Sequence, residues 1–140
     1  MEVKRADKEK CIEAVRARLS AEQTISFAYL HGSFVSKPRF NDIDIAVYVN
    51  EMPASPTRFE LDLENSLAGY CANLQNISFD VRVLNTSPMA FRYQASKDAI
   101  LLFSHDEQAR VSFEANTRSL YFDFVPLRNS YLAGALGRAV

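Results

Sequence analysis

The chain has 140 residues, of which 48% are apolar, and it carries a net charge of -1. This apolar content is enough for one core of ordinary size, so we expect a single domain over residues 1–140. The small net charge excludes a general electrostatic attraction to nucleic acid or to an anionic membrane, so a phosphate-bearing ligand needs a local site. With no secretory leader and no apolar run near ~18 residues, we predict a cytoplasmic protein without a membrane span.

The two cysteines, Cys11 and Cys71, lie far apart and form no CxxC motif or Cys/His cluster. Cysteines in this arrangement are most often small core residues. We therefore predict that both are reduced and lie on the faces of helices.

The first part of the chain predicts one helix and two strands. Three apolar residues at helical spacing, Ile12, Val15 and Leu19, indicate an amphipathic helix over 6–19 that packs on a sheet. Residues 24–31 alternate and are rich in aromatic and β-branched side chains, which indicates a strand that Gly32 ends. The Ile/Val-rich run 42–49 indicates a second strand.

A helix and a third strand should follow. Ser55 before Pro56 is typical of an N-cap and a first helical position, and it predicts a helix to about residue 74. The stripe of this helix that faces the core comprises Phe59, Leu63, Leu67, Tyr70 and Leu74. Residues 77–84 alternate between apolar and polar, which indicates a half-buried strand with Ser78, Asp80 and Arg82 on its polar side.

The last part predicts a short helix, a strand and a longer helix. Ser87 and Pro88 repeat the cap signal before a helix of about two turns, and 99–103 form a fourth apolar run. Ser104 and Glu107 form a capping box for the last helix, which Pro126 should kink or end. The side chains that this helix should bury are Ala109, Phe113, Leu120, Tyr121 and Phe124.

Strands that alternate with helices predict an α/β or α+β fold, with a small mixed sheet and helices packed mainly on one face. The polar sides of three strands are the reason to expect a less covered second face. No internal repeat or linker argues for a second domain.

The unusual feature of the second strand is its pair of aspartates, Asp42 and Asp44. Aspartate is depleted in strands, and residues two apart point to the same face, roughly 6.6 Å from each other. Asp80 lies on the polar side of the third strand, so three carboxylates converge if these two strands are neighbours. Such carboxylates repel one another unless cations neutralise them, and Mg²⁺ is the cation that takes a few carboxylates plus substrate phosphates. Two such ions suit phosphoryl or nucleotidyl transfer.

The turn at Gly32 and Ser33 supplies a matching phosphate site. A residue without a side chain lets a phosphate approach the backbone, and the serine hydroxyl adds a donor. Lys37 and Arg39 in the connection that follows are candidates for phosphate contacts, although such loops are more often simply solvated. Arg82 is a third candidate, with a structural ion pair to Asp80 as the rival interpretation.

Other readings of the same residues are less specific. Glycosyltransferases and haloacid-dehalogenase phosphatases also use a DxD motif, but there the motif ends an apolar strand. Here the residues before it are polar and the apolar run follows. We assign no catalytic role to His31 or His105.

Taken together, Gly32-Ser33, the spacer, Asp42-Ile43-Asp44 and Asp80 resemble the polymerase-beta-type nucleotidyltransferase superfamily, and within it the minimal nucleotidyltransferases, which are about this short. The resemblance spans about residues 24–83 and continues more loosely towards residue 124. It implies the polymerase-beta-like nucleotidyltransferase fold, with Gly32 and Ser33 holding the triphosphate. It also implies that Asp42, Asp44 and Asp80 bind two Mg²⁺ ions and carry catalysis. The spacer departs from the family because residues 34–41 are few and include no glycine.

The resemblance also implies a partner. Minimal nucleotidyltransferases commonly pair with a small helical HEPN protein encoded nearby, as antitoxin and toxin. We therefore expect transfer of AMP from ATP to a hydroxyl on such a toxin, in a homo- or hetero-oligomer. Two alternatives stay open: a binding module that neutralises a partner with little or no catalysis and, less favoured because no acceptor-binding domain is visible, a nucleotidyltransferase for a small molecule such as an aminoglycoside.

Overall fold

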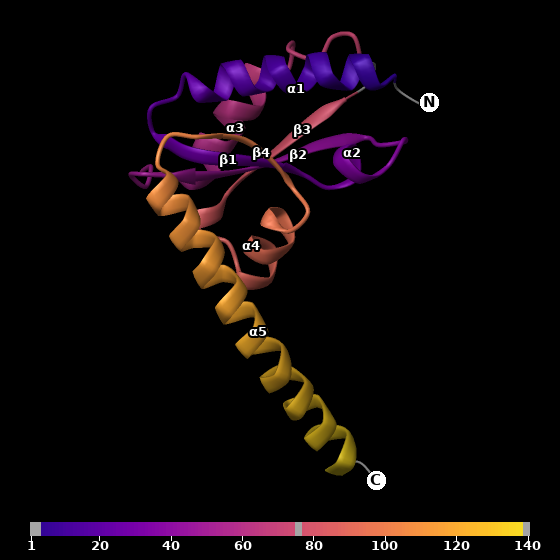
Figure 1. Cartoon of the computed structure of the whole chain (residues 1–140), viewed down its shortest axis with the longest axis vertical. Helices are drawn as coiled ribbons and strands as arrows, with labels where there is room; N and C mark the ends of the chain where they lie inside the picture. The colour runs from indigo at the N-terminus through magenta and orange to yellow at the C-terminus, as the bar shows by residue number, and fades with distance from the viewer. Residues whose placement is uncertain (1–3, 75–76, 139–140) are drawn as a thin grey trace.

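The computed structural model describes residues 4–74 and 77–138, and for 124–138 it describes the backbone alone. Helices and strands alternate along most of the chain (Figure 1). In chain order the elements are α1 (Arg5–Ser20), β1 (Ile25–His31), α2 (Ser33–Ser36), β2 (Asp42–Val49), α3 (Pro56–Leu67), β3 (Ser78–Val83), the 3-10 turn η1 (Leu84–Thr86), α4 (Met89–Ser96), β4 (Ile100–Ser104) and α5 (Glu107–Arg138).

The strands form one four-stranded sheet in the order β3-β2-β1-β4. β1 pairs antiparallel with β2 and with β4, whereas β2 and β3 are parallel. The predicted α/β fold with a small mixed sheet is confirmed. The parallel pairing brings the polar side of β3 next to the start of β2.

The main core lies between one face of the sheet and the helices α1 and α3, which lie on the same side of it (Figure 1). Apolar residues at alternate positions of β2, such as Ile43, Ile45 and Val47, are fully buried there. They pack with Val15 and Leu19 of α1, as the helical spacing predicts. One face of β2 therefore packs in this core, and at the start of β2 the other face carries the polar residues Asp42 and Asp44.

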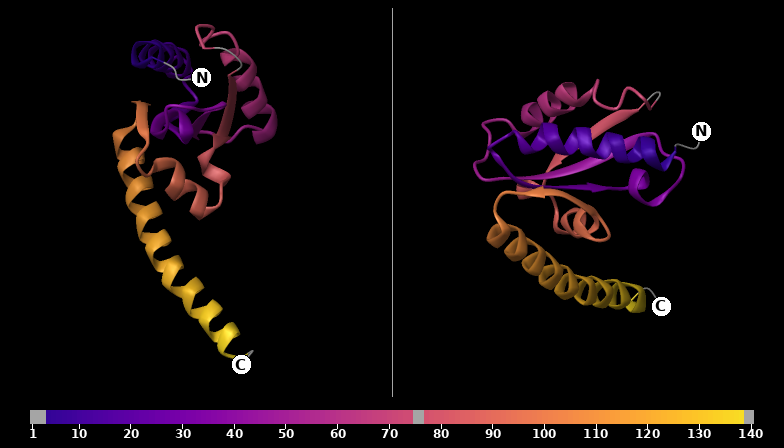
Figure 2. Two further views of the ribbon diagram at one scale, coloured as in Figure 1. Left: turned by 90° about the vertical axis from the view of Figure 1, so that its right-hand side faces the viewer. Right: turned by 45° about the horizontal axis from the view of Figure 1, so that its top comes forward.

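A smaller apolar cluster covers part of the second face, where α4 and α5 lie (Figure 2). Its centre is Phe27 of β1, whose ring stacks on Tyr48 at 4.8 Å and meets Phe113 of α5 at 5.6 Å. β1 is thus buried on both faces, more than alternation alone predicts. The helices at this end leave the first residues of β2 uncovered.

α3 begins as predicted but ends sooner. Ser55 Oγ accepts a hydrogen bond from Arg58 N at 3.2 Å, which is the expected N-cap. The helix ends at Leu67, about two turns before the predicted end, and the chain continues in turns. Tyr70 is consequently 43% exposed instead of buried, because helical spacing no longer applies to it. The prediction of a helix to residue 74 is wrong.

The predictions for both later helix starts and for the end of α5 also need correction. Pro88, not a serine side chain, precedes α4. At α5 the cap is Asp106, whose Oδ1 accepts from Ala109 N at 3.0 Å. The backbone of α5 continues as a helix through Pro126 to Arg138 and projects beyond the sheet (Figures 1 and 2). Leu120 is 53% exposed, whereas the next residue, Tyr121, stacks on Tyr93 of α4 at 3.9 Å. Phe124 lies outside the described side chains.

The prediction of two reduced cysteines is wrong. Cys11 of α1 and Cys71 in the turns after α3 are both buried and form a disulfide with a Cα–Cα distance of 5.1 Å. The two helices pack on the same face, which brings residues 60 positions apart within bonding range. Among the described helices, none combines the length and the apolar character needed to cross a membrane.

Candidate active site

The three aspartates lie on one face of the sheet at the start of β2. Asp44 is paired in register with Asp80 across the parallel β2–β3 ladder, and Asp42 with Ser78. Residues paired in this way point to the same side, so Asp42, Asp44 and Asp80 share the face opposite the main core. The expected convergence of the three carboxylates on one face is what this register produces.

The edge strand β3, which carries Asp80, is fixed from its outer side. Glu64 Oε2 accepts from Val81 N at 2.9 Å, and Glu60 Oε2 accepts from Val83 N at 2.8 Å. These two carboxylates of α3 satisfy backbone donors that an edge strand would otherwise expose. The strand is thereby held in place on both sides, by β2 and by α3.

Asp44 is partly buried among charged side chains. Partial burial raises the pKa of its carboxyl above the usual value, and the negative charges of Asp80 and Asp42 raise it further. The positive charge of Arg82 acts in the opposite direction. The ionised carboxylate of Asp44 is therefore less stable here than in water. A bound cation would stabilise it, as expected for a metal ligand.

Asp80 has a partner within the chain. Arg82 Nε donates to Asp80 Oδ1 at 3.1 Å, and both side chains are about half exposed, at 58% and 45%. This is the structural pair that the sequence suggested as a rival interpretation. A pair this exposed contributes little to stability, about 0–1 kcal/mol. The pair holds Arg82 beside the carboxylates, where the guanidinium could exchange Asp80 for a phosphate.

The turn after β1 packs directly against Asp44. Gly32 has φ 80° and ψ -159°, a conformation that is nearly restricted to glycine. A Cβ added there would lie 3.1 Å from Asp44 Cγ and closer still to Oδ2. Ser33, half-buried, follows at once and opens α2. The glycine therefore allows the backbone of the turn to reach the carboxylate.

The two basic residues of the spacer are not brought to the carboxylates by any contact in the described part of the chain. The side chains of Lys37 and Arg39 are exposed. Within the described residues neither forms an ion pair. Their predicted role as phosphate contacts stays a prediction.

His31 is the site residue that sequence reasoning left without a role. It is paired with Asp44 across β1 and β2, and its ring lies edge-on to Phe91 of α4 at 5.7 Å. Its Nε2 is buried and has no hydrogen-bond partner in the described structure. Burial lowers the pKa of His31, and the charge of Asp80 opposes this shift. Its position next to Gly32 was the one available signal, and its register with Asp44 could not be read from the sequence.

The donor set suits a hard divalent cation, because its members are carboxylates, and the charges of Asp80 and Asp42 raise the pKa of Asp44. Across the described residues, no three His, Cys, Asp or Glu side chains are already arranged as a metal-binding group. The pairing of Asp80 with Arg82 accounts for this in part, since that carboxylate is turned to a guanidinium. The residues that would hold a cation thus lie on one face of the sheet, but their carboxylates are not arranged in a coordination geometry.

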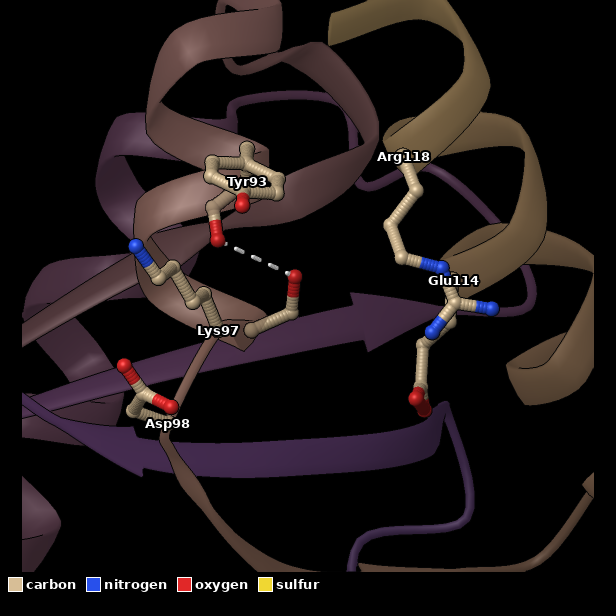
Figure 3. A pocket seen from close by; sticks show the side chains of 6 residues that line it. Tyr93, Lys97, Asp98, Glu114 and Arg118 are labelled. Atoms are coloured by element: carbon tan, nitrogen blue, oxygen red, sulfur yellow. Dashed lines mark hydrogen bonds between the residues drawn. The ribbon is translucent and has the colours of Figure 1, made fainter. Parts of the chain in front are cut away.

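A separate cavity of about 250 Å³ lies between α4 and α5 (Figure 3). None of the three aspartates lines it. Its lining residues carry charges of both signs around one aromatic ring, and they are Tyr93, Ser96, Lys97, Asp98, Glu114 and Arg118. Glu114 also accepts a hydrogen bond from Tyr29 Oη at 2.8 Å, which joins α5 to β1.

Comparison with known proteins identifies related sequences and structures. The family model described as polymerase beta, nucleotidyltransferase matches residues 13–108, more than half of the chain. No curated protein sequence is significantly similar to the chain.

Three of the similar solved structures are toxin–antitoxin complexes. The first is the tri-AMPylated Shewanella oneidensis HEPN toxin in complex with MNT antitoxin, matched at 21% identity and a TM-score of 0.65 over 94% of this chain and 97% of that chain. The second, the MntA–HepT toxin–antitoxin, matches at 20% identity and a TM-score of 0.64 over 95% and 99%. The third, a toxin–antitoxin with AMP-PNP, matches at 21% identity and a TM-score of 0.67 over 92% and 98%. At this level of identity the similarities establish the shared fold.

Proposed function

This chain belongs to the polymerase beta nucleotidyltransferase family, and from that membership we propose that it is a Mg²⁺-dependent nucleotidyltransferase. The observation that carries the proposal is the register of Asp44 with Asp80, beside a glycine turn that packs on Asp44. A nucleotidyl-transfer site needs carboxylates that bind metal ions and backbone groups that a phosphate can reach. In this chain the turn at Gly32 lies next to Asp44.

We assign the roles as follows. Asp42, Asp44 and Asp80 hold Mg²⁺, and Gly32 and Ser33 hold the triphosphate. Mg²⁺ held by these carboxylates would neutralise the charge of the triphosphate and lower the pKa of the acceptor hydroxyl. In the transfer, the acceptor oxygen forms a bond to the α-phosphorus, the bond from that phosphorus to the bridging oxygen breaks, and pyrophosphate leaves.

The residues of the chain contribute positioning and charge. The absence of a side chain at Gly32 admits phosphate oxygens to the backbone of the turn. Arg82, released from Asp80 when that carboxylate takes a cation, can pair with phosphate instead. Asp80 is our candidate for the base that receives the acceptor's proton.

The structurally similar complexes suggest the donor and the acceptor. One holds AMP-PNP, and another contains a HEPN toxin that carries AMP groups and is bound to an MNT antitoxin. We propose that this chain likewise transfers AMP from ATP to a hydroxyl of a HEPN-type protein and acts as its antitoxin. Such a role requires a hetero-oligomer, and it places the protein where ATP is available, in the cytoplasm.

A second candidate function is neutralisation of a partner by binding alone. The ion pair between Asp80 and Arg82 favours it, because that pair occupies the third carboxylate in the absence of a cation. The two functions differ in what happens to the partner, since only catalysis modifies it covalently.

The test is transfer of label from ATP carrying ³²P at the α-phosphate to a HEPN-type protein encoded beside this chain. Label should appear on the partner only with Mg²⁺ and should vanish with Asp42→Asn or Asp44→Asn. Asp62→Asn, an exposed carboxylate on α3 that pairs with Arg58, is the matched control and should transfer normally. Neutralisation that survives both site substitutions without any label would establish the binding-only function.

A further inference from the structure

The spacer between the Gly32 turn and β2 has little structure of its own. α2 is one turn of four residues, Ser33–Ser36, and residues 37–41 are mostly exposed. An exposed segment of this kind is mobile unless contacts from elsewhere hold it. The position of the proposed triphosphate turn therefore depends on contacts that other elements make to the spacer.

The spacer is held in two ways: Phe34 is buried in the main core with Val35 and Phe40 packed against it, and the spacer backbone is bound by Lys8. Lys8 belongs to α1, whose N-terminal end lies near α2 (Figures 1 and 2). Lys8 Nζ donates to Phe34 O at 2.8 Å and to Lys37 O at 2.9 Å. The same ammonium lies 5.1 Å from the ring centroid of Phe34 and 4.8 Å from that of Phe40, within reach of a cation–π interaction. The two rings meet edge to face at 4.6 Å. One cation thus joins the beginning and the end of the spacer.

The helix that carries Lys8 is a fixed support. Val15 and Leu19 of α1 are fully buried against the sheet. Cys11, less than one turn from Lys8, is bonded to Cys71. Partial burial also lowers the pKa of the Lys8 ammonium. A displacement of the spacer from α1 would therefore break the Lys8 contacts without moving α1.

The contacts of Lys8 reach the site through α2. Gly32 O accepts from Val35 N at 3.1 Å and from Ser36 N at 3.3 Å, so the turn and α2 move as one unit. Gly32 in turn packs against Asp44. Holding α2 on α1 consequently sets the separation between the turn and this carboxylate.

We propose that Lys8 is a positioning residue for nucleotide binding, which clamps α2 and the spacer to α1 and thereby holds the Gly32 turn at the separation from Asp44 that a triphosphate requires. The proposal rests on the proposed nucleotidyltransferase function. Without the Lys8 contacts, only some of the molecules have the turn in the position that binds nucleotide. The apparent dissociation constant then equals the intrinsic one divided by the fraction of such molecules.

The test compares three variants of the full chain. Lys8→Met keeps the stem but removes the charge and the donors, Lys8→Arg keeps both, and Lys10→Met changes an exposed lysine of the same helix. The dissociation constant for AMP-PNP with Mg²⁺ is measured by calorimetry, KM and kcat by AMP transfer, and amide exchange over residues 33–41 by mass spectrometry. Each variant is also melted to show that it is folded.

Lys8→Met should raise both the dissociation constant and KM about tenfold, with kcat within about threefold of the wild type, and it should speed amide exchange over 33–41. Lys8→Arg should restore most of the affinity, and Lys10→Met should match the wild type. Equal nucleotide affinity in folded Lys8→Met and wild type would overturn the proposal, as would a loss of kcat at unchanged KM. If Lys8→Met does not fold, Lys8→Gln takes its place with the same expectations. Failure of the proposed function itself looks different, because the wild type would then bind no nucleotide.

Discussion

Replacement of Gly32 by alanine should damage both stability and activity, and the structure gives the size of each effect. Gly32 adopts φ 80° and ψ -159°, where a side chain costs about 1–3 kcal/mol of backbone strain. At about 4 °C per kcal/mol for a chain of this size, the melting temperature should fall by roughly 4–12 °C. The new methyl group would also displace the Asp44 carboxylate, since it lies 3.1 Å from Cγ. Misplacing a catalytic ligand by about 1 Å costs on the order of 10²-fold in rate.

The assays are thermal unfolding and AMP transfer, with Gly69→Ala as the control. A Cβ at Gly69 meets nothing within 4 Å, and its φ is not in the left-handed region. Gly69→Ala should therefore leave activity unchanged and be neutral or stabilising by about 0.4–1 kcal/mol. If Gly32→Ala melts and transfers AMP like Gly69→Ala, the close packing of the turn on Asp44 does not govern the site.

Three further changes follow from individual contacts. Asp44→Asn should abolish transfer and raise the melting temperature of the metal-free protein at neutral pH, because the folded pKa of Asp44 is raised and its ionised form is therefore penalised in the folded state. This penalty develops as pH rises from 3.8 through the folded pKa, so a pH series of melts should show the difference between variant and wild type vanish in acid. The Cys11–Cys71 disulfide spans 60 residues, so its reduction should lower the free energy of unfolding by about 4 kcal/mol. Denaturant titrations with and without reductant measure this loss, and an unchanged midpoint would contradict a structural role. Tyr29→Phe removes a hydroxyl that donates to Glu114, so urea titration should show a loss of about 1 kcal/mol, and a loss near zero would mean that this bond does not hold α5 to β1.

Much of the fold could be predicted because strand periodicity is local. The bounds of β2, Asp42–Val49, are those that the Ile/Val-rich run indicates, and the shared face of Asp42 and Asp44 follows from a period of two. The position of Asp80 required one further fact, the parallel pairing of β2 and β3, which no local pattern carries.

The errors occur where tertiary contacts decide. Gly69, directly after the C-cap Ala68, is a signal for the end of α3, but apolar residues at helical spacing continue past Leu67 and outweigh it in the prediction. Leu74 is buried by the turns instead of by a helix. α5 continues through Pro126 despite the lost backbone donor. The disulfide joins Cys11 to a residue 60 positions away, a distance at which spacing has no predictive value.

The residues that surround the motif could not be predicted from the sequence either. His31 becomes a site residue only because β1 pairs with β2 at Asp44, and the contacts of Lys8 depend on where α1 lies relative to α2. Both residues lie outside the motif that the family resemblance uses. Their side chains still form the surroundings of that motif.

The most direct test of the central claim, that this chain transfers AMP through its aspartates, is the intact mass of its HEPN-type partner after incubation with ATP and Mg²⁺. The account predicts that the mass increases by one or more adenylyl groups with the wild type and that it stays unchanged with Asp44→Asn or with a chelator. An unmodified partner that is nevertheless neutralised by the wild type would contradict the account.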